Sequence, residues 1–482
     1  MTEARAIFKN TAALAAAMLI ERASSVVLIL IVSRTHHAAG LGIYSGALAI
    51  FAVLAVIAEQ GSTSFLVREI ARDRSKTNPY FLQLGVLAIV LGLMTMALMQ
   101  LVVPRLGYSD DLAMSVSVIT LAIIPATLNS MHEAIFIAYQ RVHFQTYTTL
   151  IATLLNTGLS LYLLAAGYGI VSLIIAFVAT KCLITVCYFF FLNRYILPLR
   201  WDFHWSSTLL LVRKIKMFAA SSILGGLFAR PEVIMLTLLR GEAQTGYYTA
   251  ALKLVDLCYL LPDTFMTNIF PALSRSYHHV REKAQIIQDK SIKYLLALSL
   301  PLAAAMTVAA EPVIQLLYGP GFQDSVLVLR ILAWNLPVYC LNGLLWRVLV
   351  ARGEQSSNVR VQVITSCTRL ASGYALISGF GILGAAAGSV ANLMLHNRLL
   401  SLYIKRDGTC LRPMLLGWRF AVIALVTGLF MYALIGQIDL WILAPIAAVG
   451  YLILTLLLKA FSGEDLHLFW RLIPSRMARK DA

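Results

Sequence analysis

Long apolar stretches, separated by short polar ones, dominate the pattern of this chain. A helix that crosses the hydrocarbon core of a bilayer needs about 20 mostly apolar residues. The fourteen segments of this kind, each of which we expect to be a membrane-spanning helix, are 11–33, 41–60, 81–103, 113–138, 146–166, 168–192, 217–239, 246–270, 291–310, 323–350, 361–380, 382–404, 413–435 and 439–461. The pattern therefore predicts an all-α, polytopic membrane protein.

Basic residues alternate between the polar junctions, and this alternation orients the predicted spans. The two termini and every second junction together hold 27 Lys and Arg residues, whereas the other junctions hold only Arg34, Arg105 and Arg240. Loops rich in Lys and Arg lie in the cytoplasm. We therefore expect both termini to be cytoplasmic, and most of the net charge of +16 reflects topology.

Composition excludes several other classes of protein. With 59% hydrophobic and 13% charged residues and a mean hydropathy of +0.79, the chain has too few charges to cover soluble domains, and a nucleic-acid binder is not expected. The sequence shows no catalytic constellation and no phosphate-binding loop, so neither an enzyme nor a cofactor is expected. The six cysteines lack the spacing of a metal site.

An internal repeat divides the predicted spans. Residues 41–48 resemble residues 245–252 at an offset of 204, which also aligns Glu59 with Asp263. Six spans separate the copies, so the repeat predicts two parallel six-helix lobes with a substrate path between them, followed by two further helices. The domains expected from this division are an N-lobe (1–195), a cytoplasmic linker (196–216), a C-lobe (217–405) and the last two helices with a cytoplasmic tail (406–482).

Charged residues inside the spans are the candidates for function. A charge at the bilayer centre costs about 2.5–3.5 kcal/mol on insertion scales, so such residues normally face a protein interior or a wet cavity. The candidates for a cationic, substrate-binding cavity are Arg22, Arg230, Lys253, Arg330, Arg369 and Arg398. The candidates for ion coupling or gating are Glu21, Glu133, Glu232, Asp256 and Asp263. The prolines expected to kink helices are Pro125, Pro231 and Pro262.

Other interpretations of these charges remain open. A residue near the end of a span can snorkel to the interface, and Lys253 with Asp256 can form a purely structural salt bridge. The second six spans carry a net charge of +3 and the first six a net charge of −1. A cavity lined by Arg and Lys would attract a phosphate or diphosphate, and carboxylates among them could take up a proton or Na⁺.

Short motifs in both halves carry a family resemblance. They are Phe8-Lys9-Asn10, residues 40–44, Gln60-Gly61-Ser62, residues 67–70, residues 246–253 and residues 270–274. In their order and spacing, the chain resembles the polysaccharide-biosynthesis flippases, the O-antigen (Wzx-type) exporters of the multidrug/oligosaccharidyl-lipid/polysaccharide (MOP) exporter superfamily.

This resemblance implies a flippase in the bacterial inner membrane. Such a protein moves undecaprenyl-diphosphate-linked oligosaccharide units to the periplasmic leaflet by alternating access, for O-antigen or exopolysaccharide assembly. Similar flippases have a cationic central cavity, to which Arg22, Arg230 and Lys253 would correspond. The partners implied are the polyprenyl-diphosphate-linked glycan, membrane lipids, a glycan polymerase and a chain-length regulator.

Two other functions are compatible with parts of the sequence. A drug/cation antiporter of the same fold, like the MATE transporters, would be favoured by a cavity dominated by acids. A membrane glycan polymerase or ligase usually has a large extracytoplasmic loop, whereas the outer junctions predicted here are short, the longest being residues 311–322.

Overall fold

The computed structural model describes residues 2–198, 200, 205–227, 230–279, 281–405 and 413–461. Parts of the expected linker 196–216 and of the expected segment 406–482 lie outside the described residues. The chain divides into two compact units, which are described separately: unit 1 comprises residues 1–253, 317–325 and 366–388, and unit 2 comprises residues 254–316, 326–365 and 389–482.

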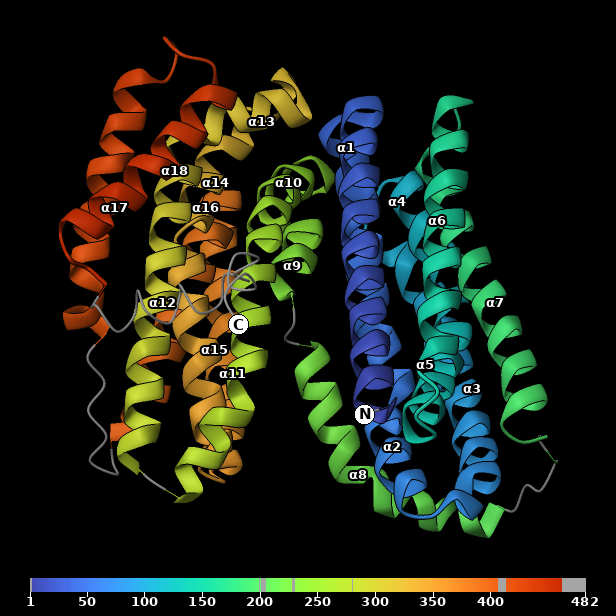
Figure 1. Ribbon diagram of the computed structural model, residues 1–482. Helices are drawn as coiled ribbons and strands as arrows, with labels where there is room; N and C mark the ends of the chain where they lie inside the picture. The colour runs from blue at the N-terminus through green and yellow to red at the C-terminus, as the bar shows by residue number, and fades with distance from the viewer. Residues whose placement is uncertain are drawn as a thin grey trace. The chain divides into compact units, whose positions relative to one another are not determined.

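Unit 1 contains most of the first half of the chain (Figure 1). Its helices are α1 (Thr2–Glu59), α2 (Ser62–Arg72), η1 (Arg74–Lys76), α3 (Thr77–Val102), η2 (Val103–Arg105), α4 (Asp110–Ile119), η3 (Thr120–Ala122), α5 (Ile123–Ala138), α6 (His143–Ala165), α7 (Ile170–Tyr195), α8 (Trp205–Leu227), α9 (Pro231–Arg240), most of α10 (Glu242–Cys258), η4 (Pro320–Phe322) and the middle of α16.

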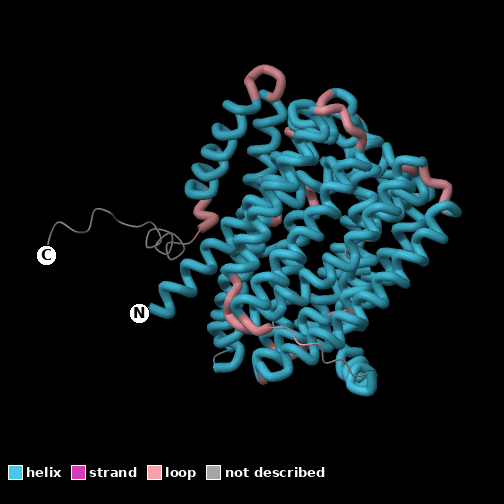
Figure 2. The backbone as a smooth tube through the Cα atoms, turned by 90° about the vertical axis from the view of Figure 1, so that its right-hand side faces the viewer, coloured by secondary structure: helices cyan, strands magenta, loops and turns pink. Residues whose placement is uncertain are grey.

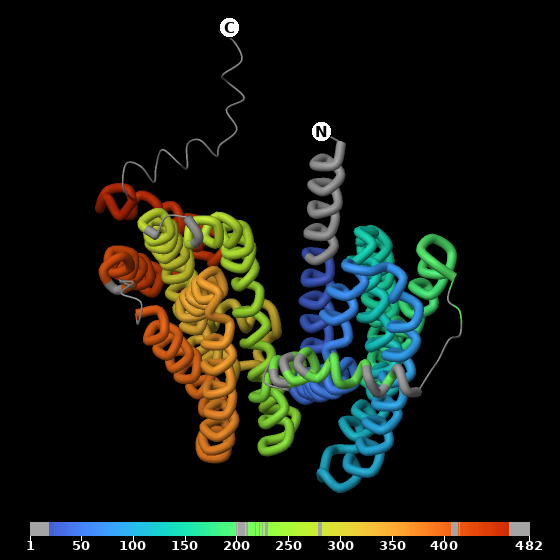
Figure 3. Tube along the Cα trace, turned by 90° about the horizontal axis from the view of Figure 1, so that it is seen from below, coloured from blue at the N-terminus to red at the C-terminus, as the bar shows by residue number. Residues whose placement is uncertain are grey.

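Unit 2 contains most of the second half. Its helices are the end of α10, α11 (Leu260–His279), α12 (Arg281–Val308), most of α13 (Ala310–Tyr318), most of α14 (Asp324–Leu332), α15 (Asn335–Ala351), both ends of α16 (Gln355–Lys405), α17 (Pro413–Leu434) and α18 (Leu440–Leu457). Within this unit α12 lies beside α17, as Figure 3 shows.

The described residues form an all-α fold in which helices are joined by short loops (Figure 2). Ten of the helical segments described are long and apolar enough to cross a membrane, judged by length and composition. Two of these segments contain two predicted spans each, because α1 is interrupted at His37 (φ 54°) and α16 at Gly381 (φ 57°). The predicted spans 217–239 and 246–270 fall on α8–α9 and α10–α11. The expected all-α, polytopic membrane fold is confirmed.

Local sequence explains several helix ends near the predicted junctions. The Ser109 hydroxyl accepts a hydrogen bond from the Leu112 amide at the start of α4. Asp110 and Asp111 lie in the first turn, where their negative charges interact favourably with the helix dipole. Gly61 has a left-handed conformation (φ 70°) between α1 and α2. A side chain there would also collide with the Phe218 backbone, so the chain needs glycine at this turn.

Apolar side chains hold each unit together. In unit 1, one buried cluster joins α2, α3 and α5 through Phe65, Phe81 and Met131. In unit 2, another joins α11, α12 and α15 through Met266, Ile292 and Leu344. Many large apolar side chains remain exposed, among them Met94, Phe380, Leu425 and Trp441. Such exposure suits helices that face lipid.

Candidate functional site

A cavity of about 460 Å³ lies within unit 1 and is lined by side chains of α1, α6, α7, α9 and α10. Four charged residues line it: Arg230, Lys253, Lys181 and Glu21. The three cations outnumber the one acid, so the cavity suits an anion better than a cation. Its other polar lining consists mainly of hydroxyl groups: Ser24, Ser25, Tyr44, Ser45, Thr149, Thr153, Thr157, Thr180 and Thr249, with the amide of Asn156.

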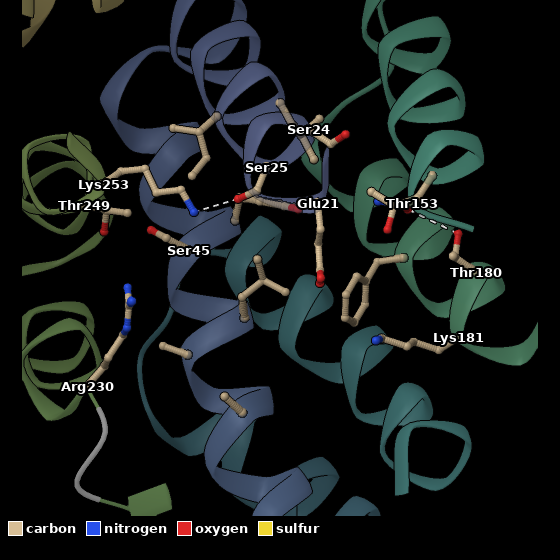
Figure 4. A pocket seen from close by; sticks show the side chains of 18 of the residues that line it. Glu21, Ser24, Ser25, Ser45, Thr153, Thr180, Lys181, Arg230, Thr249 and Lys253 are labelled. Carbon is tan, nitrogen blue, oxygen red and sulfur yellow. Dashed lines mark hydrogen bonds between the residues drawn. The ribbon is translucent and has the colours of Figure 1, made fainter. Parts of the chain in front are cut away.

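The wall formed by α9 and α10, which we call the cation wall, carries Arg230, Lys253 and Thr249 (Figure 4). Arg230 is the N-cap residue of α9, and Pro231 follows it at the first helical position, where proline needs no amide hydrogen. The Lys253 ammonium donates a hydrogen bond of 2.6 Å to the Ser25 hydroxyl of α1. The Thr249 hydroxyl is buried and has no hydrogen-bond partner among the described residues. Because an unpaired buried polar group is costly, this hydroxyl is suited to a ligand.

The opposite wall, which we call the hydroxyl wall, is formed by α6 and α7. Thr149, Thr153 and Thr157 recur at every fourth position of α6 and so share one helix face, with Asn156 beside them. The Thr180 hydroxyl of α7 donates to the Asn156 side-chain oxygen at 3.3 Å. Lys181 lies on the same wall, and its ammonium is 5.4 Å from the centre of the Phe177 ring.

The two limbs of α1 lie between these walls. Ser24, Ser25 and Glu21 come from the first limb and Ser45 from the second, and Figure 4 shows Glu21 between the two walls. Arg22 is exposed and is not part of the cavity lining, although its neighbour Glu21 is. Of the predicted substrate-binding residues, the cavity therefore brings together Arg230 and Lys253 but not Arg22.

Two other predicted residues of unit 1 form an ion pair in which the carboxylate is buried and the guanidinium is partly exposed. Arg369 donates two hydrogen bonds to Glu232, from Nε to Oε1 at 2.5 Å and from a terminal nitrogen to Oε2 at 2.7 Å. The Glu232 side chain is 5% exposed and that of Arg369 is 26% exposed. Neither residue lines the cavity. The geometry makes each charge the counter-ion of the other.

The predicted acid Glu133 lies in α5 behind the hydroxyl wall. The Tyr188 hydroxyl donates to Glu133 Oε1 at 3.1 Å and is 3.3 Å from the Thr149 hydroxyl, which lines the cavity. In the same region, the Thr185 hydroxyl donates to the Asn129 side-chain oxygen at 2.9 Å. The Glu133 carboxylate is thus connected to the cavity through the side chains of Tyr188 and Thr149.

Unit 2 contains the remaining predicted charges, and none of them lines this cavity. Arg330 of α14 is 3.9 Å from Glu311 of α13. Asp263 accepts a hydrogen bond of 2.8 Å from the Tyr339 hydroxyl. Asp256 is half-buried near the end of α10, and Arg398 is exposed on the second limb of α16.

The three predicted kink prolines occupy different positions in their helices. Pro125 is buried in the first turn of α5, which follows the 3₁₀ segment η3. Pro231 begins α9, and Pro262 lies in the first turn of α11. Pro231 and Pro262 therefore stand near a helix start, where a missing amide hydrogen costs least, whereas Pro125 lies inside the continuous helical segment Asp110–Ala138, next to its 3₁₀ interruption.

Sequence reasoning missed the hydroxyl wall. The fourfold spacing of Thr149, Thr153 and Thr157 inside an apolar span was the available signal. Lys181 lies inside the predicted span 168–192 and is not among the candidate cavity residues. Threonines are common in membrane helices, where they can bond to their own backbone, so this signal alone was weak.

Two family models match the chain. The model described as "Polysaccharide biosynthesis protein" matches residues 4–327, and the model described as "Lipid II flippase MurJ" matches residues 243–458. Among curated proteins, a probable low-salt glycan biosynthesis flippase, Agl15 of Haloferax volcanii, is 24% identical over 194 residues, which is 39% of this chain and 41% of that protein. The matched region thus spans about two fifths of this relative's length.

Solved structures share the fold. The lipid II flippase MurJ in an inward closed conformation aligns with a TM-score of 0.75 and 15% identity, covering 92% of this chain and 98% of that chain. An inward-facing multidrug resistance MATE transporter of the MOP superfamily aligns with a TM-score of 0.68 and 16% identity, covering 80% and 94%. At this level of identity, the likeness shows the fold alone.

Proposed function

The chain belongs to the polysaccharide biosynthesis protein family, whose model matches two thirds of its length, and from this premise we propose that it is a flippase for lipid-linked glycans. The expected substrate is an undecaprenyl-diphosphate-linked oligosaccharide unit. The protein would move it across the bacterial inner membrane by alternating access of two six-helix lobes, for O-antigen or exopolysaccharide assembly. In this proposal both termini are cytoplasmic, and a polymerase and a chain-length regulator act on the product.

The observation that carries the proposal is that Arg230 and Lys253 lie together on the cation wall. A diphosphate linkage is a compact anion with many acceptor oxygens, and guanidinium and ammonium groups bind it through charge-assisted hydrogen bonds. The buried Thr249 hydroxyl beside them offers a further donor. Arg230 is exposed and Lys253 is half-buried, so both cations are accessible to a substrate that enters the cavity.

Substitution of the cation wall tests this proposal. We expect Arg230→Ala and Lys253→Ala to stop assembly of the surface glycan while the protein still accumulates in the membrane. The measurement is glycan output from cells that depend on this flippase, together with the amount of inserted protein. The exposed Arg22, which lies outside the cavity, provides the control Arg22→Ala. Normal output from both cation-wall variants at normal protein levels would exclude the anion-binding cavity.

We further propose that transport is coupled to an H⁺ or Na⁺ gradient through the acids of unit 1. Glu21 lines the cavity, and Glu133 is connected to it through Tyr188 and Thr149. Glu232 is already neutralised by Arg369, which makes it a weaker candidate for taking up an ion. Asp256 and Asp263 of unit 2 remain candidates for coupling or gating. Unchanged flipping after both gradients are collapsed would contradict the coupling.

A drug/cation antiporter like the MATE transporters is the second candidate, and the shared fold favours it. The charges of the cavity oppose it, because three basic residues surround a single acid. Binding of a lipophilic cation such as ethidium, reduced by Glu21→Gln and unaffected by Arg230→Ala, would support the antiporter instead.

A further inference from the structure

The cavity of unit 1 has two chemically different walls, and the difference bears on the substrate. Arg230, Lys253 and Thr249 gather on one wall, whereas Thr153 and Thr180 lie on the other (Figure 4). A cavity that bound only phosphate groups would not need one wall with cations and another with hydroxyl groups. The inference below rests on the proposed function, since it assigns parts of the same substrate to parts of the same cavity.

The hydroxyl wall has the chemistry of a sugar-binding surface. Side-chain hydroxyl and amide groups both donate and accept hydrogen bonds, which matches the hydroxyl groups of a glycan. Thr149, Thr153 and Thr157 form a row along one face of α6. Because the residues repeat every fourth position, the row extends about 12 Å along the helix, enough for more than one sugar ring.

Packing holds this wall in place. The Phe177 ring meets the Phe51 ring edge to face, with centroids 5.4 Å apart. The Thr180 hydroxyl is bonded to Asn156, which ties α7 to α6 at the cavity surface. Polar groups fixed in this way lose little conformational entropy on binding, so the wall can discriminate between glycans.

Lys181 places a positive charge on the hydroxyl wall, away from the cation wall. Its half-buried ammonium lies over the Phe177 ring and borders the row of hydroxyls. The charge of Lys181 interacts with the Glu133 carboxylate behind this wall, but a neutral sugar does not require that charge, and the diphosphate has its own cations in Arg230 and Lys253. A carboxylate on a sugar, as in a uronic acid, would complete this arrangement, because it would pair with the ammonium while its ring contacts the hydroxyls.

We propose that the hydroxyl wall binds the glycan part of the substrate and that Lys181 selects glycans bearing a carboxylate on a sugar within its reach. The diphosphate binds on the cation wall at the same time. The two walls thus set different properties: the cation wall recognises any diphosphate-linked unit, and the hydroxyl wall distinguishes acidic from neutral units.

The test uses the full-length protein in lipid nanodiscs and three soluble probes: inorganic pyrophosphate, a tetrasaccharide that ends in glucuronic acid, and the matched tetrasaccharide that ends in glucose. Calorimetry gives the Kd of each probe. We expect the wild type to bind the acidic tetrasaccharide about tenfold more tightly than the neutral one, as one charge-assisted contact provides. Lys181→Met should abolish that preference and Lys181→Arg should retain most of it, and both should weaken pyrophosphate binding less than Arg230→Ala does.

The chain offers a matched control for this substitution. Lys293 of unit 2 also lies over an aromatic ring, 5.5 Å from the centre of Phe461, and does not line the cavity. Lys293→Met should therefore leave all three affinities unchanged. A second variant, Thr153→Val with Thr157→Val, keeps the side-chain volume, and we expect it to weaken both tetrasaccharides while sparing pyrophosphate.

The outcomes separate this inference from the proposed function. If Lys181→Met weakens the acidic and neutral tetrasaccharides equally, or neither, selection by Lys181 is overturned. In that case, loss of pyrophosphate binding in Arg230→Ala would still support the flippase. If Arg230→Ala binds pyrophosphate normally and supports normal glycan output, the proposed function itself fails.

Discussion

Gly42 and Gly246 each pack against a backbone carbonyl in a reciprocal pair of contacts. A side-chain carbon built on Gly42 would lie 1.7 Å from the Glu242 carbonyl oxygen, and one built on Gly246 would lie 1.8 Å from that of Ala38. The two glycines are separated by the repeat offset of 204 residues, and so are Ala38 and Glu242. The contact is therefore two-fold symmetric, as expected where two copies of a repeat meet face to face. It joins the second limb of α1 to the start of α10 within unit 1.

The first prediction concerns this contact. Gly42→Ala or Gly246→Ala should each destabilise the protein by about 1–3 kcal/mol, because backbone must move to make room for the new methyl group. Thermal unfolding of the purified protein in detergent measures the loss. Gly158→Ala in α6 is the control, since its new methyl group would meet nothing within 4 Å. It should be neutral or stabilise by about 0.5–1 kcal/mol.

The symmetry of the contact also predicts how the two substitutions combine. Both open the same pair of helices, so the double variant Gly42→Ala with Gly246→Ala should lose less stability than the two single losses together. If the two losses of stability simply add, the two contacts are energetically independent. That result would contradict the view that they form one symmetric contact.

The second prediction concerns the ion pair of Glu232 and Arg369. Arg369→Met leaves the buried Glu232 carboxylate unpaired and should cost about 3–5 kcal/mol of stability, whereas Glu232→Gln leaves the partly exposed Arg369 unpaired and should cost less. The double variant Glu232→Met with Arg369→Met should recover most of this loss, because it leaves no unpaired charge. A double-mutant cycle by thermal unfolding measures the coupling. A coupling near zero would show that the pair is screened by water.

The pattern of apolar residues predicted the spans of this fold well, and the repeat predicted the equivalence of Gly42 with Gly246. The sequence pattern did not predict which side chains form pairs. Arg369 was predicted as a cavity residue, yet it pairs with Glu232, which lies 137 residues earlier in the chain. Helical periodicity identifies the face on which a residue lies, whereas the partner across that face depends on how distant helices pack.

The third prediction concerns pH and the loop before α3. The Ser75 hydroxyl and the Ser75 amide donate to Asp73 Oδ1 at 2.6 Å and 3.1 Å, and these hydrogen bonds hold the pKa of the Asp73 carboxyl below its usual value. A carboxyl whose pKa is lowered by folding adds stability above its unfolded pKa, and that stability is lost as the pH falls through the folded pKa. Ser75→Ala should therefore lower the Tm slightly at pH 7, and the difference from the wild type should shrink as the pH falls from about 5 to about 3. A difference that stays constant with pH would assign the effect to something other than Asp73.

The fourth prediction concerns the Tyr188 hydroxyl, which lies between Glu133 and Thr149. Tyr188→Phe removes the hydrogen-bond donor to a half-buried carboxylate, and we expect it to cost about 1–3 kcal/mol of stability. If Glu133 takes up the coupling ion, Tyr188→Phe should also reduce gradient-driven transport more than it reduces binding of pyrophosphate, because the cation wall is unchanged. Transport by proteoliposomes with and without an imposed proton gradient separates the two effects.

Glu133→Gln keeps a hydrogen-bond acceptor for Tyr188 but cannot take up a proton, so it should retain most of the stability and lose the response to the gradient. Full gradient-driven transport by Glu133→Gln would make this carboxylate a structural element of α5 and would direct the search for the coupling site to Glu21.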